Sequence, residues 1–269
     1  MTFPALLGLV AWAAVAAFLG AIGAVALARF AGAPAPVQPL ARLRGWDLPL
    51  AGVVLLFGQV AGLSLLEGRD PLLPPPLSQL LVGLVSGLLA WLFLGLREGS
   101  FAPRRQPVRG RRLREIGNVV SCYLIALPGF LALSGFNNRL VALLAGAPTV
   151  SGPAAGWEKL TAGPLAAVLV LAVLVLPLLE EALFRGYLWR FLAGRPDFGP
   201  RRALLYSALL FALAHQPEVW LPMLYLGGLF GWVYWRSGRL RYAVLAHALH
   251  NALAALTLLL PDTVTDVLL

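Results

Sequence analysis

The feature that most constrains this sequence is a series of apolar runs, each long enough to approach the thickness of a membrane. About 20 apolar residues in an α-helix cross the ~30 Å hydrocarbon layer of a bilayer. The runs occupy residues 3–28, 48–66, 76–96, 116–135, 162–190, 201–216, 219–235 and 240–260. Because hydrocarbon offers no hydrogen-bond partners, the backbone of each run must satisfy its own polar groups as a helix. The sequence therefore predicts an all-α fold, a polytopic membrane helical bundle with about eight transmembrane helices.

The composition and the connectors agree with this fold. Hydrophobic residues make up 59% of the chain and charged residues 12%, against about 25% charged residues in soluble domains. The stretches GAPAPVQP and PLLPPP read as connectors, because proline strings cannot continue a helix. The first run lacks a basic leader and is followed by Arg29, so we interpret it as a retained helix. We divide the single integrated bundle into a four-helix N-terminal membrane region, residues 1–150, and a four-helix C-terminal region, residues 151–269.

Basic residues mark alternate connectors of the predicted bundle. The chain has 21 basic residues, and most lie in or beside the connectors that follow the first, third, fifth and seventh runs. The exceptions are Arg69, Arg139 and Lys159. Such clustering is typical of membrane topology signals, so we expect the lipid bilayer and no nucleic acid as a partner despite the net charge of +9. The positive-inside rule places these connectors in the cytoplasm and both chain termini outside.

The stretch LLEEALFRGYLWRFL, at residues 178–192, places charges inside the fifth run. In one interpretation the helix ends at Leu179 and the glutamates lie among lipid headgroups. Against it, apolar residues resume after the charges, which favours a helix that continues to about Arg190. Glu181 and Arg185 are then one helical turn apart and can neutralise each other, whereas Glu180 points about 100° away and lacks that partner.

The three histidines of the chain also fall inside predicted spans. His215 lies in the sixth run, and His247 and His250 lie in the eighth. Asn251 follows His247 by four residues and shares its helix face, while His250 is only partly aligned. We therefore expect one buried polar site that combines Glu180 with imidazoles and a carboxamide.

These groups suit the hydrolysis of an amide inside a membrane. A desolvated carboxylate can take a proton from water and act as a general base. Imidazole can share that water or bind a metal ion. A carboxamide or imidazole donor can stabilise the oxyanion that forms when water attacks a carbonyl. No H-E-x-x-H, G-x-S-x-G or intramembrane aspartate pair indicates another class of protease.

Three short motifs in the C-terminal region carry a family resemblance. They are E-E-x-x-x-R at Glu180, Glu181 and Arg185, F-x-x-x-H at Phe211 and His215, and H-x-x-x-N at His247 and Asn251. Together, in this order and in separate spans, they resemble the CPBP intramembrane protease family, which includes type II CAAX prenyl endopeptidases and bacterial Abi proteins linked to bacteriocin self-immunity. The resemblance covers about residues 160–255 and leaves the first four spans and His250 without a role.

The resemblance implies an intramembrane endopeptidase, an integral protein of the bacterial cytoplasmic membrane whose site opens toward the cytoplasm. It assigns water activation to Glu180 and His215, oxyanion stabilisation to His247 and Asn251, and structural support to Glu181, Arg185 and Phe211. The implied substrate is a membrane-associated protein or peptide, lipidated or not.

The cofactor stays open at this stage. The family is commonly called metalloprotease, and Glu180, His215 and His247 could supply three ligands to zinc with a fourth position for water. A metal-free mechanism that uses a glutamate and a histidine fits the same residues equally well.

Two other functions also use buried polar residues. A proton-coupled membrane transporter needs intramembrane Glu and His, but such proteins usually contain repeats or discontinuous helices in matching positions, and no repeat is evident in this sequence. A non-catalytic membrane scaffold or immunity protein is the other alternative, against which the three intact motifs argue.

The charge pattern makes a prediction about topology. Reporter proteins fused after Gly110 and after Gly238 should report a cytoplasmic location, and a reporter at Leu269 should report an external one. Paired cytoplasmic and periplasmic reporters measure this directly. A cytoplasmic C-terminus would remove one span from the predicted set.

Overall fold

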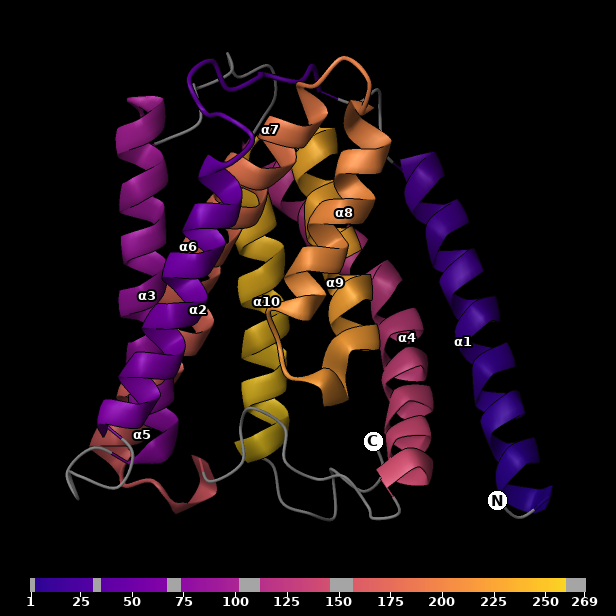
Figure 1. The fold of residues 1–269 in the computed structure, drawn as a ribbon. Coiled ribbons are helices and arrows are strands. Elements are labelled where there is room, and N and C mark those ends of the chain that lie inside the picture. Colours follow the sequence, from indigo (N-terminus) through magenta and orange to yellow (C-terminus); the bar gives the residue numbers. More distant parts are fainter. Residues whose placement is uncertain (1–2, 31–34, 67–73, 102–111, 146–156, 260–269) are drawn as a thin grey trace.

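The computed structural model of the chain describes residues 3–30, 35–66, 74–101, 112–145 and 157–259 (Figure 1). The described residues form helices and no strand, which confirms the all-α membrane bundle. The helices are α1 (Phe3–Phe30), α2 (Asp47–Leu66), α3 (Pro75–Glu98), α4 (Arg112–Ala145), α5 (Ala162–Val170), α6 (Leu176–Glu181), α7 (Arg190–Ala193), α8 (Gly199–Leu213), α9 (Trp220–Ser237) and α10 (Leu240–Leu259). The division of the chain at residue 150 stays a prediction, and that boundary lies outside the described residues.

Each predicted apolar run coincides with a helix, but the helices differ in length. Four are long and apolar enough to cross a membrane: Leu7–Ala28, Pro75–Glu98, Glu115–Leu144 and Ala162–Ala193. α2 contributes a shorter apolar stretch, Asp47–Gly62. α8 has 15 residues and is thus ~22 Å long at ~1.5 Å per residue, short of the ~30 Å hydrocarbon layer. Figure 1 shows the turn between α8 and α9 within the height of the bundle rather than at its lower end.

The helices are arranged around α8, α9 and α10. α2, α3 and the helix that runs from α5 to α7 lie on one side, and α1 and α4 lie on the other (Figure 1). The N-terminal end of α1 and the C-terminal end of α10 point to the same end of the bundle, and the C-terminal ends of α1, α3, α7 and α9 lie at the opposite end. The arginine-rich connectors follow these four helices in the sequence, and we call this the arginine-rich end.

The fifth run is one continuous helix that contains two π-helical stretches. η2 (Leu171–Val175) precedes α6, and η3 (Ala182–Trp189) joins α6 to α7. In η2 the Leu176 N–H donates to the Leu171 carbonyl five residues earlier. The next donor in that pattern would be Pro177, which has no N–H, so the carbonyl of Ala172 lacks its helical partner. π-helical turns often occur at functional sites, and the two glutamates lie between these stretches.

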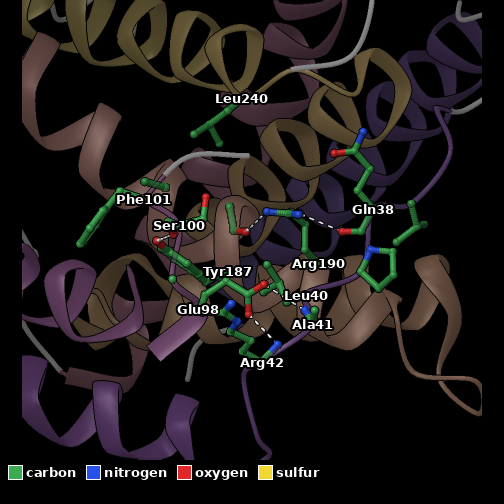
Figure 2. Close-up of a pocket in the computed structure, with 15 residues that line it drawn as sticks. Gln38, Leu40, Ala41, Arg42, Glu98, Ser100, Phe101, Tyr187, Arg190 and Leu240 are labelled. Atoms are coloured by element: carbon green, nitrogen blue, oxygen red, sulfur yellow. Dashed lines mark hydrogen bonds between the residues drawn. The ribbon is translucent and has the colours of Figure 1, made fainter. Parts of the chain in front are cut away.

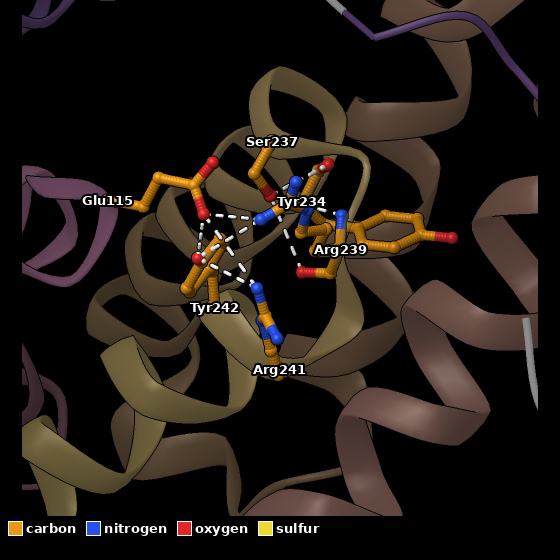
Figure 3. A network of polar contacts seen from close by, with 6 residues as sticks. All are labelled: Glu115, Tyr234, Ser237, Arg239, Arg241 and Tyr242. Carbon is orange, nitrogen blue, oxygen red and sulfur yellow. Dashed lines mark hydrogen bonds and ion pairs between the residues drawn. The ribbon is translucent and has the colours of Figure 1, made fainter. Parts of the chain in front are cut away.

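The arginine-rich end is fastened by a polar network between α4 and the turn from α9 to α10 (Figure 3). The Glu115 carboxylate accepts hydrogen bonds from Arg239 and from the Tyr242 hydroxyl. Arg241 Nη2 lies 3.7 Å from Glu115 Oε2. Gly238 ends α9 with a φ of 65°, a left-handed conformation that glycine adopts without steric strain. The network therefore fixes the first turn of α10, the helix that carries two of the three histidines.

A segment before α2, residues 35–44, crosses the same end of the bundle; we call it the N-terminal strap. The Glu98 carboxylate at the end of α3 accepts hydrogen bonds from the backbone N–H groups of Ala41, Arg42 and Leu43 at 2.9–3.1 Å. At its start the Ala35 N–H donates to the Trp235 carbonyl of α9 at 3.0 Å. The strap thereby ties α3 to α9 across the end of the bundle.

Close helix packing depends on glycine at the crossing of α8 and α9. A Cβ atom at Gly227 would meet the backbone Cα and carbonyl oxygen of Ala208 at 3.0 and 3.1 Å. At the neighbouring Gly228 a Cβ atom would meet nothing within 4 Å. Gly227 thus sets how closely α9 approaches α8, which carries the second motif.

These two glycines generate a matched prediction. Gly227→Ala should destabilise the detergent-extracted protein by ~1–3 kcal/mol, because the backbone of α8 must move away from the added methyl group. Gly228→Ala should be neutral or stabilising by up to ~1 kcal/mol, since alanine favours the helix. Thermal unfolding of the two variants checks this, and equal stabilities would contradict the proposed close crossing.

Candidate active site

The three sequence motifs lie on separate helices of the C-terminal region. Glu180 and Glu181 end α6, and Arg185 follows one turn later in η3. Phe211 lies on α8, with His215 just after the end of that helix, and α10 carries His247 and Asn251. His215 belongs to the turn between α8 and α9, which lies within the height of the bundle (Figure 1).

A fully buried carboxylate, that of Glu181, connects two of these helices. Its Oε1 accepts a hydrogen bond from Arg185 Nη1 at 2.8 Å and lies 3.0 Å from His247 Nδ1. Both Glu181 and Arg185 have exposed fractions of 0%. The i,i+4 ion pair forms as its spacing predicts, and it also anchors α10, because the imidazole is bound to the same oxygen atom.

Arg185 is held by backbone and aromatic groups beyond the ion pair. Its Nη2 donates to the Gly227 carbonyl at 2.7 Å. The guanidinium lies over the ring of Phe211 at 4.7 Å, with the Phe184 and Phe230 rings at 5.9 and 5.8 Å. Cation–π contacts of this kind partly replace the hydration that a buried guanidinium loses. Arg185 thus joins η3 to α8 and α9.

The second glutamate, Glu180, lies at the other nitrogen of the same imidazole. Its Oε2 is 3.8 Å from His247 Nε2, and its side chain is 30% exposed, whereas that of His247 is 6% exposed. Because a carboxylate paired with arginine can only accept, His247 Nδ1 carries a hydrogen, and in the neutral imidazole Nε2 then presents its lone pair. The 3.8 Å separation is too long for a direct hydrogen bond, so Glu180 and His247 offer two neighbouring acceptors.

Phe211 lies between the two motif histidines. Its ring centroid is 4.7 Å from that of His215 and 5.7 Å from that of His247. His215 Nδ1 donates to the Phe211 carbonyl at 2.7 Å, so in the neutral imidazole Nε2 is the acceptor. Within the described part of the chain, His215 forms no hydrogen bond or ion pair with Glu180 or His247.

Asn251 binds the backbone of the helix that carries the glutamates. Its Nδ2 donates to the Ala172 carbonyl at 2.7 Å. This is the carbonyl that Pro177 leaves without a helical partner, so the amide caps a buried acceptor. The contact uses one of the two amide hydrogens and joins α10 to η2.

Two residues near the site lie outside the motifs. The Phe230 ring stacks on His247 with centroids 4.6 Å apart and an interplanar angle of 16°, and no sequence signal distinguishes it from the other apolar residues of α9. His250 lies against α4, where its Nδ1 is 3.3 Å from the Tyr123 hydroxyl and its ring packs edge-on against Phe130. Its different helix face, evident from its spacing to His247, separates it from the glutamates.

The residues do not form a metal site of the usual kind. Among the described residues, no three His, Cys, Asp or Glu side chains lie close enough together to hold a metal ion. The ligand set Glu180, His215 and His247 therefore does not fit three-ligand zinc in this geometry.

The C-terminal region matches a known protein family. Residues 162–253 match the family described as type II CAAX prenyl endopeptidase Rce1-like, which confirms the resemblance that the three motifs indicate. The matched segment contains all seven motif residues and ends two residues after Asn251. Searches among curated proteins and among solved structures give no significant match.

The buried ion pair makes a prediction about stability. Arg185→Ala should cost ~3–5 kcal/mol, because it leaves the Glu181 carboxylate buried without its cation. The double change with Glu181→Ala should cost less than Arg185→Ala alone, because it removes the uncompensated charge. Thermal unfolding in detergent measures both variants. Losses that simply add would mean that the two side chains do not couple.

Proposed function

Starting from an Rce1-like domain at residues 162–253, we propose that this integral membrane protein is an intramembrane endopeptidase of the CPBP type. It hydrolyses a peptide bond in a membrane-associated protein or peptide with a water molecule activated by Glu180. The observation that carries this proposal is the position of Glu180 Oε2, 3.8 Å from His247 Nε2, with the opposite nitrogen of that imidazole bound to Glu181.

The pair of acceptors supports a role in water activation. A water molecule between Glu180 and His247 would donate one hydrogen to each and direct its oxygen lone pair toward a substrate carbonyl. As the oxygen bonds to the carbonyl carbon, Glu180 takes a proton. When the carbon–nitrogen bond breaks, Glu180 returns that proton to the leaving amine. Glu181 keeps the His247 ring in the tautomer and orientation that this step needs.

The roles of the other motif residues follow from their remaining hydrogen-bonding groups. We assign His247 to the water rather than to the oxyanion, because its N–H is already bound to Glu181. Asn251 keeps one amide hydrogen beyond its contact with Ala172, so it is our candidate for stabilising the oxyanion. His215 presents an unprotonated Nε2 and is our candidate for a second proton acceptor.

The proposal also concerns the membrane in which the protein lies and the side on which its site opens. The four helices that the arginine-rich connectors follow in the sequence, α1, α3, α7 and α9, have their C-terminal ends at one end of the bundle. This arrangement supports a cytoplasmic location for that end, in a bacterial cytoplasmic membrane. Glu180 lies in the C-terminal half of the long helix Ala162–Ala193, which ends at the arginine-rich end, and this supports a site that opens toward that side. The substrate would then reach the site from the cytoplasmic side, lipidated or not.

Replacement of the general base tests the function. Glu180→Gln keeps the shape of the side chain but removes its proton affinity, so turnover should fall by at least ~10²-fold. Membrane proteomes of cells that express the wild type or Glu180→Gln should differ by at least one cleaved protein. Hydrolysis of that protein by the purified enzyme then gives the rates.

Two measurements complete the test. The thermal stability of Glu180→Gln should match the wild type, because its side chain is partly exposed and lies outside the Glu181 ion pair. Activity that persists in a metal chelator would support the metal-free mechanism over zinc. Wild-type turnover by Glu180→Gln on a verified substrate would refute the hydrolytic role and return the buried polar groups to transport or structure.

A further inference from the structure

A cavity of about 520 Å³ lies under the N-terminal strap at the arginine-rich end of the bundle (Figure 2). This volume is within the ~300–1,000 Å³ range of small-ligand pockets. Its walls come from the strap, the end of α3, the turn after it, the long helix of the site and the start of α10. The residues that line it include Arg42, Glu98, Phe101, Tyr187, Arg190 and Leu240.

Arg190 supplies a buried positive charge to this cavity. Arg190 is 7% exposed. Its guanidinium donates hydrogen bonds from Nε to the Gln38 carbonyl at 2.9 Å and from Nη1 to the Gly186 carbonyl at 3.4 Å. No carboxylate of the described residues lies within ion-pair distance of it. A buried charge is costly unless an opposite charge compensates it, so this guanidinium suits an anionic ligand.

The other charges of the cavity do not compensate Arg190. The Glu98 carboxylate accepts three hydrogen bonds from backbone N–H groups of the strap, which occupy both of its oxygen atoms. Arg42 lines the rim and is exposed, so it adds a second positive charge. The balance of Arg42, Arg190 and Glu98 leaves the cavity with a net positive charge.

The cavity adjoins the candidate active site along two helices. Ala182 and Gly186 line it, and Ala182 directly follows Glu181. Leu240 also lines it and precedes His247 by seven residues, two helical turns on nearly the same face of α10. Arg190 follows Glu180 by ten residues, or ~15 Å of helix, which an extended peptide covers with roughly four to five residues at ~3.3 Å each.

We propose that this cavity binds a carboxylate of the substrate peptide, four or five residues from the scissile bond, through Arg190 and Arg42. The inference rests on the proposed function, because it places the peptide by reference to Glu180. Bound in this way, the anion compensates the Arg190 charge, while Phe101 and Leu240 contact neighbouring apolar side chains. A peptide fits better than a lipid headgroup, because the cavity walls are the strap and the inner helices that hold the site.

Peptide binding to the Glu180→Gln protein tests the inference without cleavage. The probes are three fluorescent hexapeptides of alanine and leucine: one with a free C-terminal carboxylate, one with a C-terminal amide, and one amide with an internal glutamate. At least one carboxylate peptide should bind about tenfold more tightly than the neutral amide, as expected for a charge-assisted hydrogen bond. The comparison of the two carboxylate peptides tells a terminal from a side-chain carboxylate.

Variants of the cavity complete the experiment. Arg190→Met should abolish the preference for the carboxylate peptides, and Arg42→Met, at an exposed position that spares the fold, should reduce it about threefold. Arg195→Met is the matched control, since this exposed arginine lies at the same end but outside the cavity and should keep the preference. Equal binding of charged and neutral peptides overturns the inference, as does loss of the preference in Arg195→Met alone.

Two further outcomes have defined meanings. Displacement of the carboxylate peptides by phosphatidylglycerol in nanodiscs, with no displacement by neutral lipid, would identify a headgroup site and also overturn the inference. Cleavage by the wild-type protein of a verified substrate, together with no carboxylate preference, would reject the cavity proposal and leave the protease in place. A carboxylate preference without any cleavage would retain an anion-binding cavity but reject the protease and, with it, the placement of the peptide by its scissile bond.

Discussion

The Glu181 carboxylate is the interaction on which the geometry of the site depends. One of its oxygen atoms binds both Arg185 and His247, and the residue is fully excluded from solvent. Buried charges of this kind contribute little to net stability, but they penalise any arrangement in which a partner is missing. The position of η3 relative to α10 is therefore specified by charge as well as by packing. Glu180 is presented to His247 because its neighbour has already fixed the imidazole.

Aromatic residues also fix the positions of Arg185 and the motif histidines. Phe211 contacts Arg185 and both motif histidines, and Phe230 stacks on His247. Gly227 allows α9 to approach α8 closely and offers its carbonyl to Arg185. These contacts come from helices of the same C-terminal region. The N-terminal part of the chain adds the strap and, through Glu115 of α4, the polar network, and both fasten the arginine-rich end of the bundle.

The sequence predicts the helices and the local Glu181–Arg185 contact better than the contacts between helices. Apolar runs identify each helix, because hydrocarbon leaves the backbone no other option. The spacing of Glu181 and Arg185 predicts their ion pair, since an i,i+4 separation is a local property of a helix. That His247 binds Glu181 through one nitrogen and faces Glu180 with the other depends on the rotation of α10, which no local pattern encodes. The Arg190 cavity is hidden for the same reason, because residues far apart in sequence form it.

The π-helical stretch that precedes the glutamates has a consequence for the angular phase of the long helix. An α-helix advances ~100° per residue, so a single extra residue accommodated in a π turn rotates everything that follows relative to what came before. The apolar face of the helix before η2 and its polar face after η2 therefore need not lie at different angles on one helical wheel. Asn251 binds the carbonyl that opens at this point and so holds the offset in place. In such a helix, side chains at one angular position can face lipid in the turns before η2 and a buried polar site in the turns after it.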